Sequence, residues 1–309
     1  MLHKTIFKLN LCYLRNSCRL FSRHIKKSKL KTDSNNQCLI KPKQLWKPAV
    51  ITISVTGVSF ASAIIIDYEK HRFSKDLLPE SFHQLRRKYE IINRIYLTWI
   101  RLNPCEKVFF GICAFNLLVC FGLKTIPHRL FPYFVSQART KMLLPSMILH
   151  IFSHSSLLHL AANMYVLYSC LPMINYHLGT SQSWALYLSA GVFASFISIV
   201  HKCCRGIHQP SLGASGAILG ILAASCMINP DAKLGILFIP NLLFPAKYGI
   251  CGIIAFDTMG IIRRWKLFDH AAHLGGTLFG IWYINYGQEL IWRQRNRFLR
   301  SYVELKKRF

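Results

Sequence analysis

Long apolar runs separated by short polar connections dominate the chain. A helix needs roughly 20 mostly apolar residues to cross the hydrocarbon layer, and the runs of suitable length predict seven helices. These cover residues 48–66, 108–123, 157–176, 182–200, 211–229, 248–262 and 270–288. Another apolar run, 234–246, is broken by Pro240 and Pro245, so we expect it to dip into a membrane rather than cross it. The pattern predicts an all-α polytopic membrane protein.

The first predicted helix stands apart from the others, because the mixed-charge stretch 67–107 separates it from a compact block of six. We therefore expect one extra N-terminal transmembrane helix at 48–66, a charged linker at 67–107 and a six-helix core at 108–290. A basic tail at 291–309 completes this one-plus-six arrangement.

Composition agrees with the hydrophobic pattern, since 52% of the residues are hydrophobic and 17% are charged. The 39 Lys and Arg residues exceed the 12 Asp and Glu residues. The basic residues gather at the termini and between apolar runs, which indicates membrane topology and argues against a nucleic-acid partner. Residues 1–47 are rich in Lys and Arg, with Asp33 as their one acid. We interpret this segment as a mitochondrial targeting sequence that ends in the matrix, the alternative being a basic cytosolic tail.

The distribution of Lys and Arg among the short connections predicts which side the N-terminus occupies. The connections on the N-terminal side carry a set of basic residues, namely Lys124, Arg129, Arg139, Lys141, Lys202, Arg205, Arg263, Arg264 and Lys266. The opposite side carries Lys233 and Lys247 beside Asp231. The short connections thus place the N-terminus in the matrix of a mitochondrial inner-membrane protein. The basic tail from residue 293 would be placed on the opposite side by an odd number of spans, which runs against this rule; we treat that placement as tolerated.

Two side chains with catalytic potential are predicted to lie at similar depth. Ser215 lies about 6 Å into the fifth helix and His273 about 8 Å into the seventh, at 1.5 Å per residue, and both helices start from the same side. Gly216 with Gly220, and Gly276 with Gly280, form G-x-x-x-G faces that let helices approach closely. A hydroxyl and an imidazole at one depth are what a nucleophile and its general base require.

The third predicted helix and the run before it add His150, His154, His159 and Asn163. His159 and Asn163 are four residues apart and share a face, so they could donate to an oxyanion beside the Ser215 backbone N–H. Each residue also has a structural interpretation: Ser215 as a packing residue, His273 as a hydrogen-bonded structural histidine. The three histidines could suggest a metal site, but the sequence has no H-E-x-x-H motif, no evident carboxylate ligand near them and no C-x-x-C pair. We therefore expect no metal and no cofactor.

These motifs resemble those of the rhomboid family of intramembrane serine proteases. The residues that carry the resemblance are His154 just before the third predicted helix, His159 and Asn163 within it, Gly213-Ala214-Ser215-Gly216 in the fifth, and His273, Gly276 and Gly280 in the seventh. The resemblance covers about residues 105–295 and implies a six-helix rhomboid core. It also implies an endopeptidase that cleaves single-span membrane proteins in the lipid bilayer.

Carried over residue by residue, the resemblance implies that Ser215 is the nucleophile and His273 the general base and acid, with no Asp completing a triad. His159, Asn163 and Gly213 would line the oxyanion hole, and His154 would be a supporting or water-binding neighbour. Gly216, Gly276 and Gly280 would pack the helices. The Trp-Arg pair that many rhomboids carry is not evident in 124–149, a feature that mitochondrial members tend to share, so only the shape of this loop is in question.

Two acids bear on the predicted dyad. Asp269 lies a turn nearer the matrix than His273, where we expect a solvated carboxylate. Asp257 is at about the depth of Ser215, and because an unpaired carboxylate there would be costly, we expect it to face a wet cavity or a polar partner. Two other functions stay open at this point: a catalytically inactive rhomboid relative that binds membrane helices, and a transporter that uses the third-helix histidines.

Overall fold

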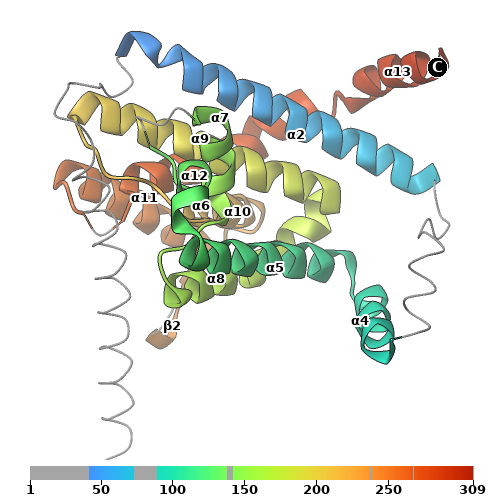
Figure 1. The fold of residues 1–309 in the computed structure, drawn as a ribbon, viewed down its shortest axis with the longest axis horizontal. Helices are drawn as coiled ribbons and strands as arrows, with labels where there is room; N and C mark the ends of the chain where they lie inside the picture. Colours follow the sequence, from blue (N-terminus) through green and yellow to red (C-terminus); the bar gives the residue numbers. More distant parts are fainter. Residues whose placement is uncertain (1–41, 73–88, 138–141, 237–238, 267, 309) are drawn as a thin grey trace, which may run out of the picture.

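The computed structural model describes residues 42–72, 89–137, 142–236, 239–266 and 268–308. The predicted targeting segment 1–47 therefore lies almost wholly outside the described residues, and so does part of the linker, 73–88. The described chain forms a helical bundle (Figure 1).

Each of the seven predicted apolar runs is helical, apart from short ends. The helices are α2 (Trp46–Arg72), α5 (Pro104–Thr125), α8 (Leu157–Leu178), α9 (Thr180–Arg205), α10 (Ser215–Ile228), α11 (Ala246–Ile262) and α12 (His270–Trp282), which continues as the π-helical segment η3 (Tyr283–Trp292). Four of them, α2, α5, α8 and α9, are long and apolar enough to cross a membrane. The all-α polytopic class is confirmed, while the one-plus-six count of crossings stays a prediction.

Shorter elements precede, connect and follow the long helices. They are η1 (Pro42–Gln44), α4 (Glu90–Arg101), α6 (Pro127–Phe134), α7 (Leu143–Leu149), η2 (His150–Phe152) and the C-terminal α13 (Arg295–Lys306). No side chain of α4 or α13 is fully buried, and Leu299 of α13 packs partly buried against the core.

The run 234–246 is not helical. It forms two antiparallel strands, β1 (Lys233–Ile236) and β2 (Ile239–Pro245), with Lys233 opposite Pro245. Proline has no N–H for a sheet and is found at strand edges and ends, which fits Pro240 and Pro245 in a two-stranded hairpin. This small sheet is the exception to the predicted all-helical chain.

Helix α9 is the central element of the bundle and the most buried of the four long helices. It packs against α2, α10 and α12, while α8 covers another side of α10 and α11 packs on α12 (Figure 1). Small residues on α9 make this dense packing possible, because they let three neighbours approach one helix. The buried small residues are Ser183, Ala185, Ser189, Ala190, Gly191, Ala194, Ser195 and Ser198.

Helices α10 and α12 touch backbone to backbone through their glycines. A Cβ added to Gly276 would lie 1.9 Å from the Gly216 carbonyl oxygen, and one added to Gly280 would lie 2.1 Å from the Gly220 carbonyl oxygen. Such distances leave no room for any side chain. The two G-x-x-x-G faces therefore meet, which fixes the first turns of α10 and α12 next to each other.

We expect Gly276→Ala to destabilise the bundle by about 3 kcal/mol, the upper end of the cost of overpacking, because the new methyl group meets backbone that cannot rotate away. Thermal denaturation of the detergent-solubilised protein measures the effect. Gly252→Ala in α11 is the matched control, since an added Cβ there meets nothing within 4 Å and alanine favours helix by about 1 kcal/mol. Equal stability of the two variants would contradict the close backbone contact.

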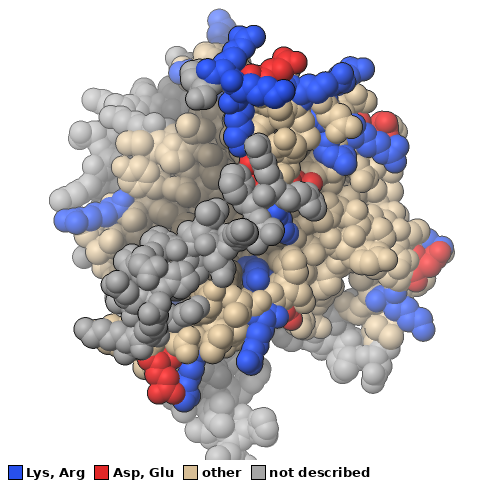
Figure 2. All heavy atoms as spheres, turned by 90° about the vertical axis from the view of Figure 1, so that its right-hand side faces the viewer, with Lys and Arg blue, Asp and Glu red and all other residues tan. Residues whose placement is uncertain are grey.

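Uncharged side chains cover broad areas of the face drawn in Figure 2, and most Lys and Arg side chains on it gather toward the margins. Large exposed apolar side chains accompany this pattern on the long helices, for example Ile53 and Val58 in α2 and Leu118 and Phe121 in α5. Exposed apolar surface of this extent is what a lipid-facing bundle presents.

Candidate active site

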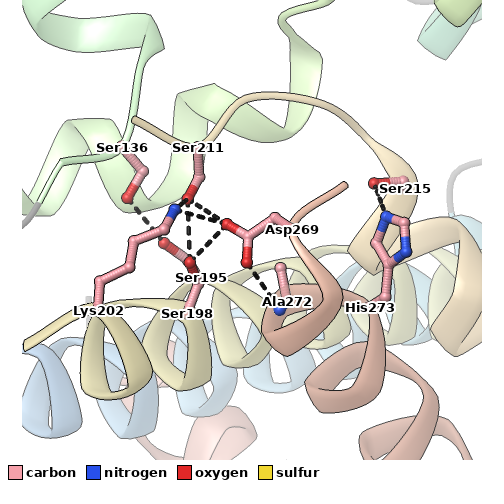
Figure 3. Close-up of polar contacts among 9 residues, drawn as sticks. All are labelled: Ser136, Ser195, Ser198, Lys202, Ser211, Ser215, Asp269, Ala272 and His273. Carbon is pink, nitrogen blue, oxygen red and sulfur yellow. Dashed lines mark hydrogen bonds and ion pairs between the residues drawn. The ribbon is translucent and has the colours of Figure 1, made fainter. Parts of the chain in front are cut away.

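Ser215 and His273 meet at the first turns of α10 and α12. Ser215 is the first residue of α10, and its Oγ lies 2.8 Å from His273 Nε2 (Figure 3). Both side chains are half-buried. The two atoms are within hydrogen-bonding distance, as the depth argument predicted, and the glycine contact between the helices holds them there. Their catalytic roles stay predictions at this point.

A buried carboxylate lies behind the imidazole. Asp257 of α11 is 1% exposed, and its Oδ1 lies 3.4 Å from His273 Nδ1. The same oxygen lies 2.7 Å from Nδ1 of His270, which is also buried. The expectation that Asp257 has a polar partner is confirmed, because it has two. The implication that no Asp joins the dyad stays untested; a carboxylate 3.4 Å from Nδ1 is nevertheless near enough to favour the tautomer whose Nε2 accepts the Ser215 proton.

Asp257, His270 and His273 could in principle hold a metal ion, because one ligand atom of each lies within 4.8 Å of the others. Ligands of a tetrahedral zinc ion at about 2.0–2.2 Å from the metal lie more than about 3 Å from one another. The separation of 2.7 Å between Asp257 Oδ1 and His270 Nδ1 is instead that of a hydrogen bond. A hydrogen bond therefore accounts for the Asp257–His270 contact as it stands.

His159 and the Ser215 hydroxyl both lie beside Gly213. Gly213 has φ 125°, in the region that favours glycine, and a Cβ added there would lie 3.0 Å from His159 Cε1 and 3.8 Å from Ser215 Oγ. The His159 ring and the Ser215 hydroxyl thus flank the same glycine. Ser155 Oγ lies 3.1 Å from His159 Nδ1, so Ser155 can fix this ring and leave Nε2 for another partner.

Asn163 and His154 surround His159. Asn163 lies one turn along α8 and is 8% exposed, and its Nδ2 has no partner among the described residues. The His154 ring packs edge-on against the His159 ring, with centroids 5.3 Å apart, and neither of its nitrogens is paired in the described part of the chain. Buried donors without partners are costly, so these groups are available to a bound oxyanion or to water.

The expectation that Asp269 is a solvated carboxylate is wrong. Its side chain is 22% exposed, and its Oδ2 lies 2.6 Å from the Nζ of Lys202, a side chain that is 8% exposed. Asp269 also caps α12, since its Oδ1 accepts a bond from the Ala272 N–H at 3.2 Å. The carboxylate is held between α9 and α12 because a helix N-terminus and a lysine ammonium both attract negative charge.

Sequence reasoning missed His270 and Lys202 as parts of this region. Lys202 was counted only as a charge in a connection, although its spacing from Ser198 places the two on one face of a helix. His270 is three residues from His273, which also places the two on one helix face. Helical spacing could have indicated both, but not their partners Asp269 and Asp257, which lie on other elements.

Comparison with known proteins agrees with the geometry. A family model described as a rhomboid domain matches residues 143–288. The mitochondrial presenilin-associated rhomboid-like protein of Homo sapiens is 42% identical over 274 residues, which cover 85% of this chain and 72% of the human protein. Its Rattus norvegicus counterpart is 44% identical over 278 residues, with the same coverage of 85% and 72%.

A more distant relative comes from yeast. Mitochondrial rhomboid protein 1 of Saccharomyces cerevisiae is 32% identical over 209 residues, which cover 66% of this chain and 60% of the yeast protein. The matched family model spans α7 to η3 and so includes Ser215, His273 and Asp257. From the fold, the site and these relatives, the chain belongs to the rhomboid family and is a multi-pass mitochondrial membrane protein.

Proposed function

We propose that the chain is a serine endopeptidase of the mitochondrial inner membrane that cleaves single-span membrane proteins within or near their transmembrane helix. Rhomboids are generally serine proteases that act on membrane proteins in the lipid bilayer. The observation that carries the proposal is the 2.8 Å contact between Ser215 Oγ and His273 Nε2, with Asp257 behind the imidazole.

In the proposed reaction, Ser215 Oγ attacks the scissile carbonyl carbon as its proton passes to His273 Nε2. The tetrahedral intermediate collapses when His273 gives that proton to the leaving amine nitrogen and the C–N bond breaks. A water molecule then attacks the acyl-enzyme ester while His273 takes its proton. Release of the new carboxyl group returns the proton to Ser215 Oγ. Asp257 stabilises the imidazolium that forms in both steps.

The negative oxygen of each tetrahedral intermediate needs donors. The Ser215 N–H lies in the first turn of α10, where backbone donors have no helical acceptor. His159 Nε2 and Asn163 Nδ2 supply two side-chain donors from α8. Removal of one such donor typically lowers kcat by 10²–10³-fold. The unpaired nitrogens of His154 are suited to hold the hydrolytic water nearby.

A substrate helix must open before it can react, because its carbonyls are shielded by i to i−4 hydrogen bonds. Substrates with helix-breaking or small residues near the cleavage position are therefore favoured. The positive-inside pattern of the short connections supports an N-terminus in the matrix and a catalytic site that opens on the same side.

Labelling with a fluorophosphonate tests this proposal directly. An activated serine oxygen displaces fluoride from the probe and forms a stable phosphonyl ester, whereas an ordinary hydroxyl does not react. We expect the purified wild-type protein to be labelled and Ser215→Ala not to be. Ser225→Ala, a half-buried serine of the same helix, is the matched control and should be labelled like the wild type. Folded wild-type protein that resists the probe would point instead to an inactive relative that binds membrane helices.

A further inference from the structure

A polar cluster near the dyad, mostly buried except for the 22%-exposed side chain of Asp269, takes no part in the reaction described above. Lys202 Nζ donates to Asp269 Oδ2 at 2.6 Å and also to Ser211 Oγ. The hydroxyls of Ser198 and Ser211 donate to the same carboxylate oxygen, each at 2.6 Å. Figure 3 shows these side chains converging on Asp269, at a distance from Ser215 and His273. We call Lys202, Ser198, Ser211 and Asp269 the clamp.

One arm of the clamp holds the catalytic base. Asp269 is the N-cap of α12, and its backbone carbonyl accepts the His273 N–H at 3.0 Å. His273 therefore lies in the first turn of the helix whose start Asp269 fixes. Any shift of the Asp269 carboxylate moves that turn and, with it, the imidazole.

The other arm holds the nucleophile. Ser211 lies four residues before Ser215, on the segment that leads into α10. Its backbone pairs with Ser136 in both directions, at 2.9 and 2.8 Å, and its side chain is bound within the clamp. Gly213, between Ser211 and Ser215, donates its N–H to the His150 carbonyl at 3.1 Å. The chain segment that precedes Ser215 is thus held by hydrogen bonds at Ser211 and at Gly213 before α10 begins.

Both arms are anchored on α9, the central and most buried long helix. An ammonium and a carboxylate that lie largely out of water are tolerated when they are paired and hydrogen-bonded to further groups. Here both hydroxyls donate to the Asp269 carboxylate, and Ser211 Oγ also accepts from Lys202. The Lys202–Asp269 pair, with its added hydroxyl hydrogen bonds, has one favourable geometry. The pair therefore sets the distance between the segment before Ser215 and the start of α12.

We propose that Lys202 and Asp269 are positioning residues, which hold Ser215 and His273 in register by clamping the nucleophile segment and the cap of α12 to α9. The inference rests on the proposed protease function, because it concerns the reactivity of the same serine. Misplacement of a catalytic group by about 1 Å can lower a rate by about 100-fold. The clamp thus affects the rate at which Ser215 reacts and not the affinity of the protein for its substrate.

The test measures the rate of fluorophosphonate labelling per folded molecule, together with kcat, KM and the melting temperature. Lys202→Met keeps the length of the side chain but leaves Asp269 without its cation. We expect this variant to be labelled about 10- to 100-fold more slowly, with kcat reduced in parallel and KM within about twofold of the wild type. Lys202→Arg retains the charge and should recover most of the rate.

Two further variants separate positioning from stability. Lys202→Met with Asp269→Asn removes both charges while Asn still caps the helix, so it should fold yet stay slow. Lys247→Met, the control, breaks the exposed 2.7 Å ion pair with Asp231 and should react like the wild type. Wild-type rates in folded Lys202→Met or in the double variant would overturn the clamp, as would equal losses in Lys202→Met and Lys202→Arg. Absence of any reaction in the wild type would instead refute the protease function.

Discussion

Ser215→Ala is expected to abolish cleavage of a co-expressed single-span membrane protein, with a loss on the order of 10⁴- to 10⁶-fold, as in serine proteases that lose their nucleophile. The reason is that no other described side chain is hydrogen-bonded to His273 Nε2 in the way that Ser215 Oγ is. The protein level should stay unchanged, because alanine is well tolerated in a helix and the glycine contact between α10 and α12 does not involve the Ser215 hydroxyl. The ratio of precursor to product in isolated mitochondrial membranes measures the effect.

Ser225→Ala serves again as the control, since it removes a hydroxyl from the same helix away from His273. Comparison of the membrane proteins of cells that carry wild-type or Ser215→Ala protein extends the experiment to natural substrates. Single-span precursors should accumulate in the variant alone. Persistent cleavage in Ser215→Ala would refute the assignment of the nucleophile, even if the fold and the family stand.

The sequence predicted the helices well because the physics that sets them is local. A membrane-crossing helix must be apolar along its length, so α2, α5, α8 and α9 follow from hydropathy to within six residues of their observed ends. The hairpin β1–β2 was not predicted as strands. Its apolar run is short and interrupted by prolines, and hydrophobic periodicity cannot distinguish a buried strand from a helical segment of that length.

The meeting of Ser215 with His273 could be predicted because depth along a helix can be counted and glycine faces indicate close packing. The environment of Asp269, in contrast, could not be predicted. Asp269 was expected to be solvated, since depth alone places it at the helix start, whereas its partner Lys202 lies 67 residues away along the chain. The sequence indicates that a buried charge needs a partner, but only the packing of α9 against α12 identifies it.

Asp257→Asn is expected to lower kcat by about 10² to 10⁴-fold, the upper value being the effect of the matching change in a serine-protease triad. An Asn side chain keeps the size of Asp257 but has no charge to stabilise the imidazolium, and its amide group can favour the wrong tautomer of His273. KM should change little, because Asp257 is buried behind the imidazole and does not face substrate. Steady-state kinetics on a purified single-span substrate, with melting temperatures as a check on folding, measure both values.

His270 provides the discriminating control, because Asp257 Oδ1 lies nearer to His270 Nδ1, at 2.7 Å, than to His273 Nδ1, at 3.4 Å. If Asp257 acts on the catalytic base, His270→Gln should keep most of the activity, since the carboxylate then has His273 as its main partner. If Asp257 only stabilises the contact between α11 and α12, the two variants should lose stability and activity together. A larger loss of kcat in Asp257→Asn than in His270→Gln, at equal melting temperature, is therefore the result that identifies Asp257 as the third member of the catalytic group.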